Sequence, residues 1–192
     1  ERIAGLLSKI LPIQLEMCDF KSCYKTNWRK KLKHGTAVYG VFYDEDKDDV
    51  QICAIDILNV YCDMNIPNVQ ESPFLFISSI VSNEELKEEY PAYSALFDGD
   101  AQVKTYNGTH TVADRTEVVD CYYKKRVEGK DVLHLVKLVG DTIIDASEDR
   151  PSLSNGIYEH GMYPVVFDTL YPDDDSPFGF GVIDIIKNPQ IY

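Results

Sequence analysis

The first apolar residues of the chain recur at helical spacing. Between residues 2 and 17, Ile and Leu side chains return every three or four positions, which predicts a helix. Pro12 lies inside this stretch and is expected to kink the helix or to split it near Leu11. The chain is therefore predicted to begin with helical structure.

A second helix is predicted between Asp19 and Gly35. Aspartate commonly caps a helix N-terminus, and glycine commonly ends a helix. Lys30, Lys31 and Lys33 would lie in the last turn, where positive charge is favourable. One face of this helix would carry a row of large apolar side chains four residues apart: Tyr24, Trp28 and Leu32.

From residue 36 the hydrophobic period becomes two, which indicates β-structure. Residues 36–43 and 50–55 alternate around an acidic turn at residues 44–49, so they are predicted to form a hairpin. Residues 117–146 contain three alternating runs separated by short turns with Gly, which predicts a meander. The predicted strands after the hairpin are residues 57–63, 74–81, 117–127, 131–139, 142–146 and 163–167.

Three other segments break the strand pattern. Ser82–Glu85 has the form of a capping box and predicts a short helix that ends before Pro91. Residues 98–115 lack either period, contain many turn-forming residues and are interpreted as a mobile loop. An acidic turn at residues 171–177 precedes a last helix, which begins at Val182.

These elements predict an α+β fold. N-terminal helices are followed by a mainly antiparallel, sheet-like or barrel-like domain, and the chain ends in the first turns of another helix. The expected domains are a helical segment at residues 1–35, an α+β domain at 36–181 and the start of a helix at 182–192. Because both terminal segments have a helical pattern, we interpret the chain as a piece of a longer protein.

Charge is unevenly distributed along the chain. The net charge of the 192 residues is −13, yet the first 33 residues hold eight Lys or Arg side chains against three acidic ones. The remainder holds eleven basic and 29 acidic residues. An acidic body argues against a protein that wraps nucleic acid. The basic beginning is interpreted either as a solvated helix face or as a contact with phosphate or an acidic neighbour.

The composition is that of a folded domain. Hydrophobic residues make up 44% of the chain, which is too apolar for a disordered segment, and no apolar run is long enough to span a membrane. No membrane contact is therefore expected. The five cysteines are scattered without a CxxC motif and are interpreted as small buried apolar side chains in a reducing compartment. Asn107-Gly108-Thr109 matches a glycosylation sequon, a pattern short enough to recur by chance.

The sequence predicts no catalytic, cofactor-binding or metal-binding residues. Asp173–Asp175 lacks the spaced ligands of a calcium loop and is interpreted as a solvated turn. Gly179–Gly181 precedes a helix, but no Lys-Ser/Thr pair of a phosphate-binding loop follows. The histidines lie at the end of a helix, in a loop, on a strand and in a turn, without metal-ligand spacing: His34, His110, His134 and His160. The chain is predicted not to be an enzyme.

Several segments, in their order along the chain, resemble those of portal proteins of tailed bacteriophages and prophages. The similarity begins with a helix that leads into a strand and extends over roughly residues 15–192. The chain departs from the family pattern at Ile57, where Pro is common, and in an inserted Pro189. The segments that carry the resemblance are Leu32–Asp44, Ile55–Asp63, Phe74–Ile77, Ser82–Pro91, Tyr163–Phe167, Pro177–Ile183 and Asn188–Gln190.

The resemblance implies that residues 36–181 form the wing domain of a portal subunit and that Val182 begins the stem helix. Portal subunits form a ring, commonly a dodecamer, at one capsid vertex of the virion, after assembly in the bacterial cytoplasm. The implied partners are other portal subunits, the terminase large subunit, coat, scaffold and head-completion proteins, and DNA in the channel. Exposed aromatic side chains of a wing are expected to face neighbouring subunits or coat protein.

Two other functions stay open. One is a small enzyme domain whose site is completed only in a longer chain, which a well-formed pocket with perturbed acidic groups would favour. The other is a non-catalytic protein-binding module of a larger assembly, which presents a sheet edge to a peptide. A large exposed apolar surface would favour the ring subunit over both.

Overall fold

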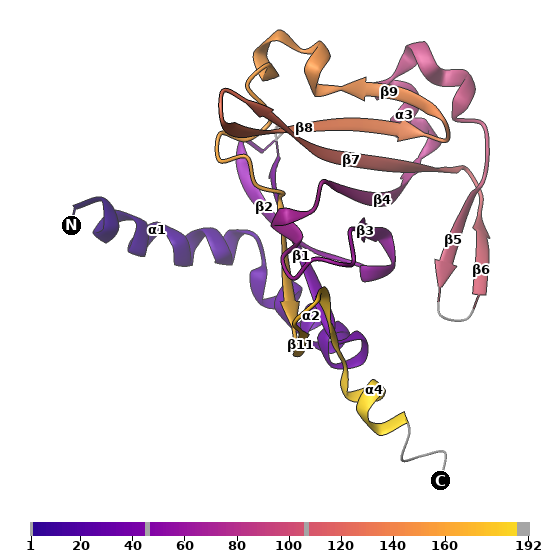
Figure 1. Ribbon diagram of the computed structural model, residues 1–192. Coiled ribbons are helices and arrows are strands. Elements are labelled where there is room, and N and C mark those ends of the chain that lie inside the picture. The colour runs from indigo at the N-terminus through magenta and orange to yellow at the C-terminus, as the bar shows by residue number, and fades with distance from the viewer. Residues whose placement is uncertain (1, 45–46, 106–107, 188–192) are drawn as a thin grey trace. The chain divides into compact units, whose positions relative to one another are not determined.

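The computed structural model describes residues 2–44, 47–105 and 108–187 (Figure 1). The chain has an α+β fold with mainly antiparallel sheets, as predicted. The predicted division into three domains follows the change of element type and stays a prediction. By internal contacts the chain divides differently, into unit 1 (residues 1–57, 64–69 and 164–192) and unit 2 (residues 58–63 and 70–163).

Unit 1 begins with two helices, α1 (Arg2–Met17) and α2 (Phe20–His34). Helix α1 runs without interruption through Pro12, so the predicted split near Leu11 is wrong. Proline removes one hydrogen-bond donor from the helix, and in an exposed helix the carbonyl that loses its partner can bond to water instead. Asp19 does occupy the N-cap position of α2, but its side chain makes no capping hydrogen bond.

The sheet of unit 1 contains three antiparallel strands in the order β10-β1-β2. Strand β1 pairs with β2 as the predicted hairpin, although two residues of its turn, Glu45 and Asp46, lie outside the described residues. The predicted acidic turn near the end of the chain is a second hairpin, β11–β12, and the last helix follows it. The bounds are β1 (Thr36–Asp44), β2 (Asp49–Ile55), β10 (Val165–Thr169), β11 (Tyr171–Asp173), β12 (Ser176–Phe180) and α4 (Val182–Lys187).

Unit 2 is built on a five-stranded antiparallel sheet in the order β3-β4-β7-β8-β9. The predicted meander is confirmed, and Glu128 and Gly129, both with positive φ, form the two-residue turn between its first two strands. The segment predicted as extended at residues 57–63 instead begins with a 3-10 turn, Ile57–Asn59. The bounds are β3 (Val60–Cys62), β4 (Phe74–Ser82), β7 (Arg115–Val127), β8 (Lys130–Val139) and β9 (Thr142–Ala146).

The interpretation of residues 98–115 as a mobile loop is wrong. This segment contains the antiparallel hairpin of β5 (Ala101–Thr105) and β6 (Gly108–Val112). All five residues of β6 are exposed, so the strand has no apolar face that an alternating pattern would reveal. Asn107 of the glycosylation sequon lies outside the described residues.

The short predicted helix is α3 (Asn83–Glu89). Ser82 is its N-cap, but the Ser82 side chain makes no capping hydrogen bond, so the capping box is not formed. The helix is held to the sheet by Leu86, which is buried with Phe97, Val118 and Ile144 in the apolar core of unit 2. Over the described ranges, the sheets do not close on themselves, so the barrel-like alternative is not formed.

Candidate interaction surfaces

The four histidines lie on separate elements. His34 ends α2, His134 lies on β8 and His160 lies in a turn, as predicted, whereas His110 lies on β6 rather than in a loop. Among residues 2–44, 47–105 and 108–187, no group of three or more His, Cys, Asp or Glu side chains has an arrangement that would hold a metal ion. None of the cysteines forms a disulfide; Cys62 is buried, which raises its pKa to about 11, and the other four are half-buried.

Unit 2 does bring together one serine, one histidine and one carboxylate. His134 Nδ1 lies 3.2 Å from Ser147 Oγ, and His134 Nε2 lies 3.9 Å from Glu148 Oε1. The Tyr123 hydroxyl donates to Glu148 Oε1 over 2.8 Å, and its ring lies against the His134 ring. Burial and this carboxylate raise the pKa of Tyr123 to about 12, while the hydrogen bond from Tyr123 lowers the pKa of Glu148. The sequence did not reveal this cluster because its members lie on three different elements.

This cluster lacks the access that a nucleophilic site needs. Ser147 is 4% exposed and His134 is 3% exposed, so a substrate cannot reach the hydroxyl. The Ser147 hydroxyl also accepts a hydrogen bond from the Leu135 N–H over 3.0 Å. The cluster therefore ties the 3-10 turn at residues 147–149 to strand β8 and satisfies buried polar groups.

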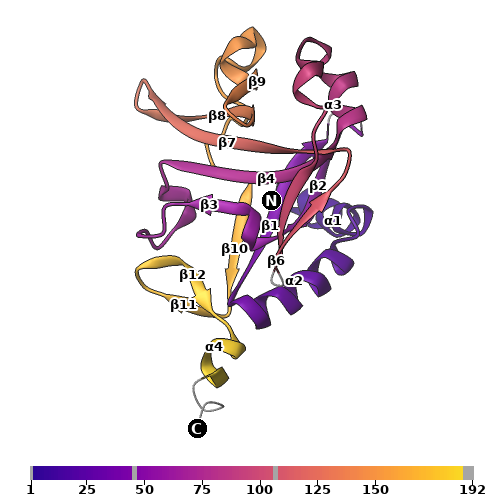
Figure 2. The same ribbon diagram turned by 90° about the vertical axis from the view of Figure 1, so that its right-hand side faces the viewer.

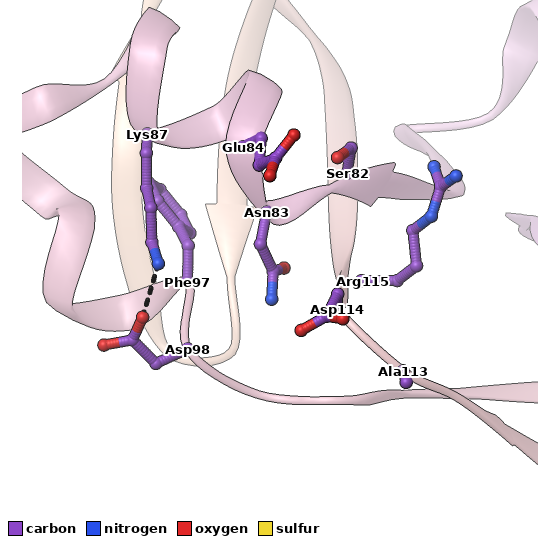
Figure 3. A pocket seen from close by; sticks show the side chains of 9 residues that line it. All are labelled: Ser82, Asn83, Glu84, Lys87, Phe97, Asp98, Ala113, Asp114 and Arg115. Atoms are coloured by element: carbon purple, nitrogen blue, oxygen red, sulfur yellow. Dashed lines mark hydrogen bonds and ion pairs between the residues drawn. The ribbon is translucent and has the colours of Figure 1, made fainter.

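An open pocket of about 510 Å³ lies beside α3 in unit 2 (Figure 3). Its floor contains Asn83, whose amide donates to Gly99 O over 2.9 Å and accepts from the Thr116 hydroxyl over 2.7 Å. Lys87 is paired with Asp98 at 2.5 Å. The residues that line the pocket are Ser82, Asn83, Glu84, Lys87, Phe97, Asp98, Ala113, Asp114 and Arg115. Because side chains of both signs surround it and its buried amide is satisfied, the pocket selects neither an anion nor a cation.

One carboxylate in unit 2 is held in an unfavourable environment. Asp120 on β7 lies directly opposite Lys137 on β8, and their charged atoms are 3.9 Å apart. Burial raises the pKa of Asp120; Lys137 opposes the rise, and the carboxylates of Glu89 and Asp145 add to it. The protonation of Asp120 is therefore expected to affect the stability of unit 2.

The glycines near the end of the chain form a close junction in unit 1. Gly35 has a φ of 78°, and a Cβ atom on it would overlap the Gly179 carbonyl oxygen. The Gly179 N–H donates to Thr36 Oγ1 over 2.8 Å, and the Gly181 N–H donates to Asp184 Oδ2 over 2.8 Å. The N–H group just before α4 is thus satisfied by the carboxylate of Asp184, a residue of the same helix. Residues 179–181 serve the close packing of β12 against the end of α2 rather than phosphate binding.

Large apolar side chains are exposed on both terminal helices of unit 1. In α1 they lie along one broad face of the helix, with exposures between 36% and 75%, and in α4 four of the six residues are exposed and apolar. Contiguous apolar surface of this kind marks a protein–protein or membrane contact. The residues are Ile3, Leu6, Leu7, Ile10, Leu11, Ile13, Leu15 and Met17 in α1 and Val182, Ile183, Ile185 and Ile186 in α4.

No family model matches the chain, and no curated protein matches it. Within the described part of the chain, no helix has the length and apolar character that a membrane span needs.

Proposed function

We propose that this chain is the wing region, with its flanking helices, of a portal subunit of a tailed bacteriophage or prophage. In this function the protein is a structural component of a ring at a capsid vertex, and it has no catalytic activity of its own. Its partners are other subunits of the ring, the terminase large subunit, coat, scaffold and head-completion proteins, and the DNA that passes through the channel. The ring assembles in the bacterial cytoplasm and remains in the virion.

The observation that carries this proposal is the exposed apolar surface of α1 and α4. Twelve large apolar side chains on two helices are more than a lone domain normally leaves in water. A subunit of a closed ring has to contact two neighbours, so it needs apolar surface at more than one place. The same surface is not expected for an enzyme that works as a monomer.

The packing of unit 1 supports the proposal. The segment that leads from α2 into β1 and the segment that leads from β12 into α4 are two of the segments on which the family resemblance rests. Gly35 and Gly179 lie against each other where these segments meet, and β10 pairs with β1. Two segments separated by more than 120 residues thus form one packed module, as the proposal requires if both belong to the wing and its flanks.

The test is negative-stain microscopy of the full-length gene product, with mass determination by native mass spectrometry. Rings with a central hole are expected. A compact monomer or dimer under every salt condition would contradict the proposal.

The open edge strand β9 favours the alternative function, a non-catalytic protein-binding module. Strand β9 is the last strand of the five-stranded sheet and exposes Ile143. An extended peptide can add to such an edge through main-chain hydrogen bonds. A full-length protein that stays monomeric but binds a peptide at this edge would support the module over the ring.

A further inference from the structure

Helix α2 exposes two parallel rows of side chains. The basic row consists of Lys21, Lys25, Arg29 and Lys33, all of them exposed and four residues apart. The aromatic row consists of Phe20, Tyr24 and Trp28, with successive ring centroids 6.1 and 6.2 Å apart. Residues four apart lie above one another on a helix, so each row is a continuous ridge. Tyr24 and Trp28 are 45% and 43% exposed.

The basic row has no partner within the described part of the chain. Other cations of α2 are paired internally, since Lys30 contacts Asp56 at 3.4 Å and Lys31 contacts Asp168 at 2.6 Å. No ion pair is formed by Lys21, Lys25 or Arg29 with any described residue. Like charges at this spacing repel one another and destabilise a helix. A row of this kind becomes favourable when an acidic surface covers it.

Hairpin β11–β12 has the complementary character. Its turn carries Asp174 and Asp175, which are exposed and form no ion pair with the residues that the structure describes. Its strands carry Tyr171 and Phe180 as a directly opposed pair, 49% and 51% exposed. The hairpin thus combines acidic and aromatic side chains, just as α2 combines basic and aromatic ones.

The two surfaces lie at different places on unit 1. In Figure 2 the hairpin β11–β12 lies to the left and helix α2 extends to the right, and both belong to unit 1. Within one copy, β12 packs against the C-terminal end of α2, where Gly35 meets Gly179. Two different patches of one protein produce head-to-tail contacts, which close into a ring when the rotation between copies allows it.

We propose that the basic and aromatic rows of α2 in one copy of the chain dock on the acidic, aromatic hairpin β11–β12 of the next copy. This inference rests on the proposed ring and names the surfaces that join its subunits. Charge complementarity selects a second copy as the partner, because the first 33 residues hold an excess of five basic side chains and the rest of the same chain an excess of 18 acidic ones. The opposed aromatic side chains supply the buried anchors that interfaces need.

The test is a charge swap in the full-length protein, with assembly measured by mass photometry across a concentration series at low salt. The first variant carries Lys25→Glu and Arg29→Glu, and the second carries Asp174→Lys and Asp175→Lys. Asp173 is retained because its carboxylate accepts the Asp175 N–H over 3.1 Å. Each variant is expected to raise the concentration for half-assembly by about tenfold or more, since like charges then face each other. The chain with all four changes is expected to assemble nearly as well as the unchanged protein.

The matched control carries Arg126→Glu and Lys130→Glu, which change the net charge by the same amount and sign as the first variant, beside an exposed turn of unit 2. This control is expected to leave assembly unchanged. Circular dichroism checks that each variant is folded, and Lys25→Gln with Arg29→Gln provides a second, milder variant.

Three results would overturn this docking contact. They are unchanged assembly in either charge-reversed variant, loss of assembly in the first variant without rescue in the four-fold variant, and an equal loss in the control. A loss without rescue would show that α2 binds another acidic molecule, such as nucleic acid. If rings form in every variant, the docking contact is contradicted but the proposed ring function is not. If the unchanged protein never assembles, the docking contact and the ring function are both contradicted.

Discussion

The two units of the chain differ in how many large apolar side chains they leave exposed to solvent. Of the 28 large apolar side chains that are exposed in the described residues, 21 belong to unit 1 and seven to unit 2. The units are of similar length, so the difference does not come from size. Unit 2 buries its apolar residues between its own sheet and α3. Unit 1 displays them on α1, α2, the β11–β12 hairpin and α4.

This difference separates residues that stabilise the folded chain from residues that are available to a partner. A buried apolar side chain contributes to folding in proportion to the surface it removes from water. An exposed one contributes little until a partner covers it. Mutations in unit 2 are therefore expected to change stability, and mutations on the helices of unit 1 to change assembly.

The largest expected effect is that of Phe97→Ala in the core of unit 2. Phe97 is 0% exposed, so the substitution leaves a cavity and is expected to lower the free energy of unfolding by about 3–5 kcal/mol. Chemical denaturation followed by circular dichroism measures the change. The matched control is Leu7→Ala in α1, which is half exposed and is expected to cost less than about 0.5 kcal/mol. Equal losses for the two variants would contradict the division between the units.

The next effect is expected at the glycine junction of unit 1. Gly35→Ala places a side chain at a φ of 78° and against the Gly179 carbonyl, so it is expected to cost about 2–3 kcal/mol. Gly5→Ala in α1 is the control, because nothing lies within 4 Å of its added Cβ. There the change is expected to stabilise the helix by about 0.5–1 kcal/mol. Thermal melting of both variants measures these changes in stability. A Gly35→Ala protein that melts at the same temperature as the unchanged protein would show that the junction is loosely packed.

A smaller effect is expected for the buried amide beneath the pocket. Asn83→Ala removes the bonds to Gly99 O and from Thr116 Oγ1 and leaves the buried Thr116 hydroxyl without its acceptor. A loss of about 1–3 kcal/mol is expected. Substitution of the exposed neighbour, Glu84→Ala, serves as the control and is expected to change stability by no more than about 0.5 kcal/mol. Denaturation curves of the two variants should differ clearly, and coincident curves would show that the amide bonds contribute nothing.

Most elements were predictable because their signals are local. The hairpin β1–β2, the meander β7–β8–β9, and helices α2 and α3 follow from apolar period and turn residues. Hairpin β5–β6 was missed because all five residues of β6 are exposed, so this strand has no apolar face that would impose an alternating pattern. The split at Pro12 and the capping bonds of Asp19 and Ser82 were wrong for a different reason, since propensity states which residue types suit a position and not which bonds they make there.

The candidate surfaces were predictable only in part. The row of Tyr24 and Trp28 and the basic excess near the start were visible in the sequence, and so was the acidic turn after Tyr171. That this turn closes a hairpin with Phe180 opposite Tyr171 was not visible, because strand pairing depends on contacts across the turn. The approach of Ser147 to His134 was hidden for the same reason, since no fixed spacing relates a strand to the turn that packs on it.

The smallest expected effect concerns the pH dependence of unit 2. Burial raises the pKa of Asp120 above its ordinary value of 3.8, so the folded state holds the proton more tightly than the unfolded state does. Ionisation of Asp120 therefore destabilises the folded state. This cost is absent below pH 3.8, grows as the pH rises towards the raised pKa, and is complete above that pKa.

Asp120→Asn removes this penalty, since the amide resembles the protonated acid, and Lys137 remains partly in contact with water. The variant is expected to melt slightly above the unchanged protein at pH 7, and the advantage is expected to vanish as the pH approaches 3.8. Melting temperatures across this range measure it. An advantage that grows on acidification, or a variant that is less stable at pH 7, would show that attraction to Lys137 outweighs burial at this pair.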